Sequence, residues 1–253
     1  MDIRLDGRVA LITGATGGIG SAITIEFFKS GATVVINGRN QEKIDALTDK
    51  LLTGGEKKDA SRILGIPMDL SALDSETNLV QRTVEKFNKL DILVNNAAMI
   101  GGNLIARCDP DFVARMMLIN YEKPYQLSRN ALTVMRKGRY GRIINITSIS
   151  GQFGDSGLSV YASSKAALHA LTQTIASEYG KSNITANSIA PGVVDTDAIT
   201  VIKDGYKQDT KKLIPCHRFA KPSEIADLAT FLASERAAYI NGQQIAINGG
   251  LYR

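Results

Sequence analysis

Short apolar runs rich in β-branched residues alternate along this chain with longer segments of helical periodicity. The apolar runs carry few charges, which is typical of parallel strands that helices cover on both faces. They predict seven strands, near residues 9–14, 32–37, 62–69, 91–96, 141–148, 184–191 and 243–249. Helices are expected up to about residue 30, over 41–52, before residue 91, and over 110–137 and 158–179.

This alternation of β and α segments indicates one doubly wound domain. We therefore expect an α/β fold in which a parallel, seven-stranded Rossmann sheet forms the middle of a three-layer α/β/α sandwich. Residues 1–253 are expected to form a single domain, because no linker, repeat or low-complexity tract interrupts the pattern. Residues 195–213 are long, mixed in charge and without a strand pattern, which favours a mobile substrate lid.

The composition excludes several classes of protein. Hydrophobic residues make up 44% of the chain and charged residues 22%, as in globular proteins. No apolar run reaches the roughly 18 residues of a membrane helix, and the N-terminal segment lacks a secretory pattern. Cys108, Cys216, His169 and His217 match no metal-ligand spacing. We expect a cytoplasmic protein without a metal site and without a membrane partner.

The net charge of +5, from 30 basic and 25 acidic side chains, is mild and scattered. It could help to attract anionic ligands, but it does not indicate nucleic acid. The densest basic stretch comprises Arg129, Arg136, Lys137, Arg139 and Arg142, with no acidic residue between them. Two interpretations stay open, a solvated helix C-terminus, where cations suit the helix dipole, and a docking site for an acidic partner.

A glycine-rich loop, "TGATGGIG", follows the first predicted strand and opens the first helix. Gly14, Gly18 and Gly20 permit a tight turn and close approach of a pyrophosphate. A helix N-terminus offers free N–H groups to such a ligand. The spacing differs from the G-x-G-x-x-G of the commoner dinucleotide fold, and a plain turn is the alternative for the loop alone.

The pentapeptide "YASSK" places Tyr161 and Lys165 four positions apart, on one face of the predicted helix. A nearby cation favours the phenolate, so we expect Lys165 to lower the pKa of Tyr161. Such a tyrosine could exchange a proton near neutral pH. Taken by itself, the pair is also compatible with a solvated helix face.

These segments together resemble the classical short-chain dehydrogenases/reductases over essentially the whole chain. The matching segments are "TGATGGIG", "NNAA" at 95–98, Asn120, Ser148, "YASSK", "PGVVDT" at 191–196 and "GQQIAINGG". Their order also matches, and Ser148 precedes Tyr161 by thirteen positions, as in that family. Within the family, the C-terminal stretch is most similar to the β-ketoacyl-acyl carrier protein reductases.

The resemblance implies a catalytic set formed by Asn120, Ser148, Tyr161 and Lys165. Tyr161 would donate a proton to a carbonyl oxygen, and Ser148 would hold that oxygen by a hydrogen bond. Lys165 would bind the nicotinamide ribose hydroxyls, and Asn120 would anchor a water that links Lys165 to solvent. Hydroxyl groups aimed at the oxygen stabilise the negative charge that hydride transfer builds there.

The resemblance also implies the cofactor contacts. Asp69 and Leu70 would contact the adenine, Asn96 and Ala97 would close the adenine-ribose side, and Asn95 would support the same region. Thr196 and the backbone after Pro191 would hold the nicotinamide carboxamide. The full expected set is Thr13, Gly14, Gly18, Ile19, Gly20, Arg39, Asp69, Leu70, Asn96, Ala97, Tyr161, Lys165, Pro191, Gly192, Val194 and Thr196.

The end of the second strand favours NADP over NAD. NAD-preferring members carry an acidic residue where this chain has Gly38, and Arg39 follows immediately. An arginine can bind the 2′-phosphate with two donors, which a carboxylate would repel. Many NADP-preferring members also have a basic residue where this chain has Gly17, so Arg39 would carry the phosphate nearly alone.

Three functions stay open at this point. The first is an NADPH-dependent reductase of a 3-oxoacyl thioester or similar ketone, with an acyl carrier protein as the acidic partner. The second is an NAD(P)-dependent dehydrogenase of a sugar, polyol, steroid or pathway-specific alcohol. The third, a cofactor-binding sensor without turnover, is disfavoured by the complete catalytic set. The resemblance further implies a homotetramer.

Overall fold

The computed structural model describes residues 3–53, 59–72, 75–197 and 204–252. Its centre is a seven-stranded sheet in the order β3-β2-β1-β4-β5-β6-β7, and every pair of neighbours is parallel. The strands are β1 (Val9–Ile12), β2 (Thr33–Gly38), β3 (Ile63–Pro67), β4 (Ile92–Asn95), β5 (Gly141–Ile146), β6 (Ile184–Pro191) and β7 (Gln244–Ile247). The predicted doubly wound Rossmann sheet is confirmed.

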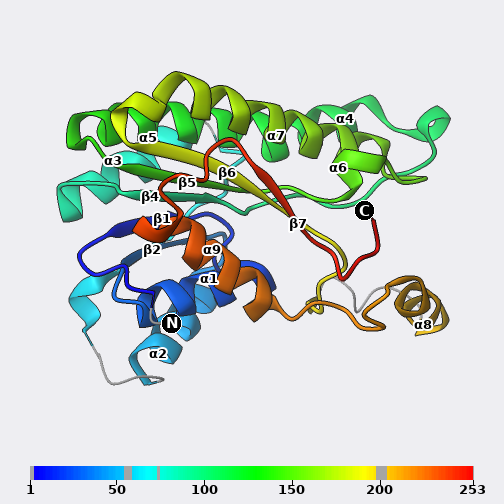
Figure 1. The fold of residues 1–253 in the computed structure, drawn as a ribbon, viewed down its shortest axis with the longest axis horizontal. Helices are drawn as coiled ribbons and strands as arrows, with labels where there is room; N and C mark the ends of the chain where they lie inside the picture. Colours follow the sequence, from blue (N-terminus) through cyan, green and yellow to red (C-terminus); the bar gives the residue numbers. More distant parts are fainter. Residues whose placement is uncertain (1–2, 54–58, 73–74, 198–203, 253) are drawn as a thin grey trace.

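Helices cover both faces of the sheet, as the uncharged strands require (Figure 1). One face packs against α1 (Gly18–Lys29), α2 (Gln41–Thr53) and α9 (Pro222–Ala233), where Phe27, Ile44 and Ile225 are buried. The other face packs against α3 (Ser75–Phe87), α5 (Lys123–Gly138) and α7 (Ser159–Tyr179). The sheet therefore has an apolar core on each face. A polar site must lie at one of the two ends of the strands.

The helix predicted over 110–137 has the expected extent but is not one uniform α-helix. α4 (Pro110–Met117) leads into a π-helical turn, Leu118–Glu122, before α5 begins. Such turns insert wider i→i+5 bonds into an α-helix and are frequent at functional sites. The turn contains Asn120, whose side chain is fully buried.

The expected lid at 195–213 lies partly outside the described residues, since positions 198–203 are not described. After them the chain forms α8 (Asp204–Leu213). The chain then returns to the sheet, where Ile214 and Phe219 pack in a small cluster with Val193. A closing motion of this segment stays a prediction.

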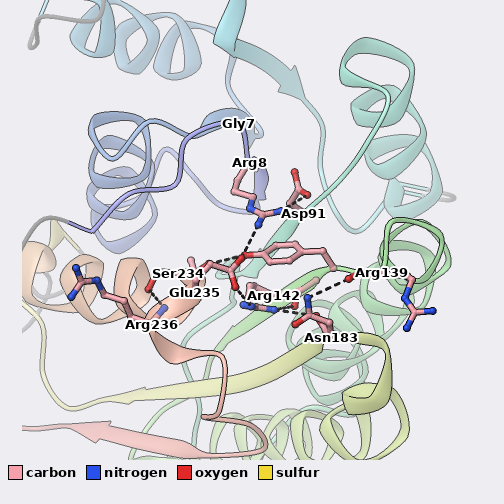
Figure 2. Close-up of polar contacts among 12 residues, drawn as sticks. Gly7, Arg8, Asp91, Arg139, Arg142, Asn183, Ser234, Glu235 and Arg236 are labelled. Carbon is pink, nitrogen blue, oxygen red and sulfur yellow. Dashed lines mark hydrogen bonds and ion pairs between the residues drawn. The ribbon is translucent and has the colours of Figure 1, made fainter.

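A charged cluster lies at the end of the sheet where the strands begin (Figure 2). The Tyr140 ring lies between two guanidinium groups, with Arg8 at 3.4 Å and Arg142 at 4.3 Å from its centroid. Glu235 accepts hydrogen bonds from both, at 2.7 Å from Arg8 and 3.2 Å from Arg142. Asp91 accepts a bond from the backbone N–H of Val9 at 2.8 Å. These contacts tie β1, β4 and β5 to the segment after α9.

Among the described residues, no helix is both long and apolar enough to cross a bilayer.

Candidate active site

The four expected catalytic side chains lie just beyond the carboxyl ends of the central strands. Ser148 follows β5, Tyr161 and Lys165 lie in the first two turns of α7, and Asn120 lies in the π-helical turn. Tyr161 is partly exposed, whereas Ser148, Lys165 and Asn120 are buried. The edge where parallel strands end is the usual ligand site of such sheets.

Asn120 fixes the loop after β4 and the start of α7. Its Oδ1 accepts a bond from the Met99 N–H at 2.8 Å, and its Nδ2 donates to the Met99 carbonyl at 2.9 Å. The same Nδ2 donates to the Ser164 hydroxyl at 3.1 Å, which itself donates to the Tyr161 carbonyl at 2.7 Å. Asn120 thereby positions the backbone that carries Tyr161. The structure does not test the water expected at Asn120.

Ser164 is a positioning residue that the sequence reasoning missed. It lies inside the "YASSK" motif, one helical turn after Tyr161. The motif could have revealed this role, because a helical serine can donate a hydrogen bond to the carbonyl of the residue three positions before it, here Tyr161.

Lys165 is 2% exposed, and burial lowers its pKa to about 8. Its ammonium donates to the Ile146 carbonyl at 2.8 Å. This is the one acceptor found for it in the described part of the chain, and an ammonium has three donors. Two buried donors thus remain for a ligand, which fits the ribose hydroxyls that the sequence predicted for this position.

The pKa of Tyr161 is raised, whereas the sequence predicted that it would be lowered. Burial raises the pKa of Tyr161, the bond with Ser148 lowers it, and the nearby Asp155 charge raises it. Lys165 is absent from these causes, although its Nζ lies 5.7 Å from the ring centroid. The physical reason is the burial of the phenol, which outweighs the bond with Ser148.

The glycine loop is held in place from β4. Thr13 accepts bonds from the N–H groups of Asn96 and Ala97 at 3.0 and 3.1 Å. The Asn96 side chain donates to the carbonyls of Thr13 and Gly14 at 3.0 and 3.1 Å. Thr13 and Asn96 therefore shape the loop and use their polar atoms within the protein. A Cβ at Gly20 would lie 2.2 Å from the Gly14 carbonyl, so only glycine fits there.

The start of α1 fits a phosphate group. Its N-cap, Gly17, makes no side-chain bond to the first turn, and that turn contains no acidic residue. The free N–H groups and the helix dipole can therefore bind an anion. A Cβ at Gly18 would meet Thr196 at 2.5 Å, so the loop after β6 lies directly over the helix start. Ile19 packs its side chain against the core, which leaves its backbone for a ligand.

The adenine end of the expected cofactor site lies after β2 and β3. Gly38 faces the Thr16 side chain, and Arg39 and Asp69 are exposed. The Ser71 N–H bond lowers the pKa of Asp69, and the Arg39 charge nearby lowers it further. Leu70 is buried, so its side chain belongs to the core. Arg39 therefore provides a cation at the position expected for the 2′-phosphate.

At the nicotinamide end of the expected cofactor site, some of the predicted contact groups are already used within the protein. Pro191 ends β6, and the Gly192 N–H donates to the Ile247 carbonyl at 3.0 Å. That N–H is therefore occupied within the sheet. Val194 is buried and bridges to Ala220, so it offers its backbone rather than its side chain. Thr196 is the partly exposed polar side chain of this segment.

Asn95 does not support the adenine region, contrary to the sequence expectation. Its side chain is buried and donates to Asn145 at 2.8 Å and to Ser128 at 3.2 Å, beneath α5. Asn145 in turn donates to Thr172 on α7 at 2.8 Å. Asn95, the last residue of β4, thus joins β4 to β5 and α5, whereas the side chain of Asn96 bonds to the glycine loop.

The described residues contain no group of three or more metal-ligating side chains.

The comparisons with known proteins agree with this geometry. Residues 14–252 match the family model described as enoyl-(acyl carrier protein) reductase. The 3-oxoacyl-[acyl-carrier-protein] reductases FabG of Rickettsia bellii and Aquifex aeolicus are 39% and 34% identical to the chain, over 98% and 100% of both proteins. A solved structure described as an NAD(P)-dependent gluconate 5-dehydrogenase from Beutenbergia cavernae, with bound NADP, is 30% identical over 99% of each chain, with a TM-score of 0.92.

The fold and the site thus define a nicotinamide-dependent oxidoreductase with a Ser–Tyr–Lys site. The chain belongs to the short-chain dehydrogenase/reductase family, and its curated relatives above are FabG enzymes.

Replacing Tyr161 with phenylalanine keeps the ring but removes the proton donor. Turnover of a ketone substrate is expected to fall by about 10²-fold or more, which is the usual contribution of general acid catalysis. Fluorescence titration should show that cofactor binding is largely retained, since the phenol is not the main cofactor contact. Turnover close to that of the unmodified enzyme would contradict the role of Tyr161.

The pH profile of reduction reports the charge on Lys165. As pH rises through about 8, Lys165 loses the charge that would stabilise the phenolate left by proton donation. Tyr161, whose pKa is raised, keeps its proton in this range. The rate of reduction is therefore expected to decline above pH 8. In a Lys165→Arg variant the cation persists, so the decline should move to higher pH, and an unchanged profile would assign it to another group.

Proposed function

We propose that this enzyme reduces 3-oxoacyl thioesters on an acyl carrier protein to 3-hydroxyacyl thioesters, with NADPH as the reductant. The observation that carries the proposal is the complete site of Ser148, Tyr161 and Lys165, positioned by Asn120 at the carboxyl edge of the sheet. Relatives that span the full chain and are named 3-oxoacyl-[acyl-carrier-protein] reductases support the substrate class.

Each side chain has a defined part in this reaction. The Ser148 and Tyr161 hydroxyls bind the 3-oxo oxygen, and Tyr161 donates its proton to that oxygen. The bound nicotinamide supplies the hydride. Lys165 uses its two remaining donors on the ribose and holds positive charge beside the phenolate that is left behind. Asn120 donates to the Ser164 hydroxyl, which donates to the Tyr161 carbonyl, and these two bonds hold the backbone of Tyr161 in place during the proton transfer.

NADP is the proposed cofactor because a cation lies where the 2′-phosphate is expected. Arg39 is exposed at the end of β2, and no carboxylate occupies the neighbouring Gly38 position. The neighbouring Asp69 already accepts two bonds from Ser71. Because Arg39 is exposed, its guanidinium can turn toward a phosphate. NAD is the alternative.

Replacing Arg39 with alanine tests this assignment. A charge-assisted hydrogen bond contributes about 1.5–3 kcal/mol, so NADPH affinity is expected to fall by about 10- to 150-fold. NADH affinity should hardly change, because NADH lacks the 2′-phosphate. Lys50→Ala, at the far end of α2, is the control for general loss of charge. Equal weakening of both cofactors would mean that Arg39 does not bind the phosphate.

The basic end of α5 is the proposed docking site for the carrier protein; it directly precedes β5 and so lies at the end of the sheet where the strands begin, away from Tyr161 of the same chain. Arg136 and Lys137 are exposed in its last turn, and Arg139 follows in the left-handed conformation with φ of 51°. Glycine is the usual residue at such a helix end, so a side chain there costs conformational energy. Asn183 stabilises the turn by donating to the Arg139 carbonyl at 3.3 Å. Arg139 thus carries its charge at a strained backbone position, which suits a role for that charge in docking.

Reversing the charge of Arg136, Lys137 and Arg139 to glutamate should raise KM for a 3-oxoacyl group on its carrier protein, mainly through slower association. Added salt should weaken the unmodified enzyme in the same way, because exposed charges are screened over about 8–10 Å. Reduction of the same acyl group on a small thiol should be unaffected. Lys86→Glu on α3 is the matched control. If KM changes equally for the carrier-bound substrate and the small thioester, the basic residues form only a solvated helix end.

A second candidate function is the oxidation of a sugar acid or polyol. The solved structures similar to this chain include proteins described as gluconate dehydrogenases, at 26% and 30% identity. Their identity to the chain is lower than that of the FabG relatives above. A substrate panel followed by NADPH absorbance would separate the two functions, since a gluconate dehydrogenase would leave acetoacetyl thioesters unreduced.

We also propose a cytoplasmic homotetramer. β7 is an edge strand whose one neighbour in the described sheet is β6, and its residues are mostly half-buried. Such an edge is a site for pairing with another copy, and closed symmetric assemblies are the common outcome. Light scattering should give about four times the chain mass of 27.2 kDa. A monomer at micromolar concentration would contradict the proposal.

A further inference from the structure

Large exposed hydrophobic side chains gather at the end of the molecule that carries the site. The described residues of this kind are Ile100, Leu104, Ile105, Tyr125, Phe153, Leu213 and Tyr239. Five of these seven lie in segments that follow the carboxyl ends of β4, β5 and β6. Single exposed apolar residues need no explanation, but a group beside a polar site indicates a binding surface.

Three of them belong to one short loop between β4 and α4. Ile100, Leu104 and Ile105 are 62%, 53% and 78% exposed. Figure 1 shows the start of α4 at the same end of the molecule as α6 and α8. We name Ile100, Leu104 and Ile105 the apolar platform.

The loop that carries the platform is attached to the elements that form the site. Its loop begins at Met99, whose N–H and carbonyl both bond to the Asn120 side chain. A Cβ on Gly102 would lie 1.9 Å from the Gly157 carbonyl, so the loop touches the segment just before α7. Tyr161 lies in the first turn of α7. The loop that carries the platform therefore borders the segment that leads to Tyr161.

The loop is also ordered within itself. Asn103 accepts a bond from the Leu104 N–H at 2.9 Å, and the Arg107 N–H donates to the Leu104 carbonyl at 2.8 Å. A short 3₁₀ turn, Ile105–Arg107, follows. The loop thus presents its aliphatic side chains to solvent in a fixed arrangement. A ligand that binds there has little of the loop left to order.

We propose that the apolar platform binds the acyl chain of the substrate, so that the enzyme prefers medium- and long-chain 3-oxoacyl thioesters to acetoacetyl thioesters. The inference rests on the proposed function. An alkyl chain covers Ile100, Leu104 and Ile105 and removes apolar surface from water on both sides. A polyol gains nothing there, because burying its hydroxyls without partners is unfavourable.

The test is a chain-length series of thioesters on N-acetylcysteamine, from acetoacetyl to 3-oxododecanoyl, which avoids any contribution from carrier docking. For each methylene group that the platform covers, kcat/KM is expected to rise by up to about fourfold. Ile105→Thr, and the double change Ile100→Thr with Ile105→Thr, should lower kcat/KM for the longest chains by about three- to tenfold. The acetoacetyl thioester should be reduced as before.

Tyr239→Ser is the matched control, since Tyr239 is fully exposed and lies outside the loop that carries the platform. Because Tyr239 lies just before β7, light scattering must first show that this variant assembles like the parent. It should leave the whole series unchanged, and circular dichroism should show the same melting temperature for each variant as for the parent. A flat series in the parent enzyme, or an equal loss at every chain length in Ile105→Thr, would overturn the platform while the reductase function stands. Failure to reduce any thioester would instead refute the proposed function.

Discussion

Parallel pairing of all seven strands is the constraint on which the site depends. Because every strand runs the same way, the loops that follow β1, β4, β5 and β6 must meet at one edge of the sheet. The order changes direction between β1 and β4, so helices leave toward opposite faces there and a crevice opens between them. Residues separated by more than a hundred positions, such as Gly14 and Tyr161, are thereby brought to a common edge without any special contact between their own segments.

The sequence predicted the fold well because strand and helix periodicities are local properties. All seven strands, and the residues that carry the glycine loop and Tyr161, lie where the pattern placed them. The π-helical turn at Asn120 was not predictable in this way. It depends on bonds to Met99 and Ser164, which are distant in sequence, and no glycine or proline lies within it.

Two site expectations failed for equally physical reasons. The pKa of Tyr161 depends mainly on its burial, which residue spacing alone does not contain. Asn95 was grouped with Asn96 by adjacency, although Asn95 bonds to β5 and α5 and Asn96 bonds to the glycine loop. The fold leaves the substrate open too, because relatives named for acyl and for sugar substrates share it. The choice between acyl and sugar substrates depends on the side chains at the entrance of the site.

The charged cluster at the amino edge has a consequence for the order of folding. Arg142 is fully buried, and its one carboxylate partner in the described chain is Glu235, which also bonds to Arg8, 227 positions away in sequence. Contacts of such separation close late, since the loop between them must first be ordered. During synthesis from the N-terminus, Arg142 therefore lacks its carboxylate partner until the segment after α9 has been made. Completion of the fold is in this way coupled to completion of nearly the whole chain.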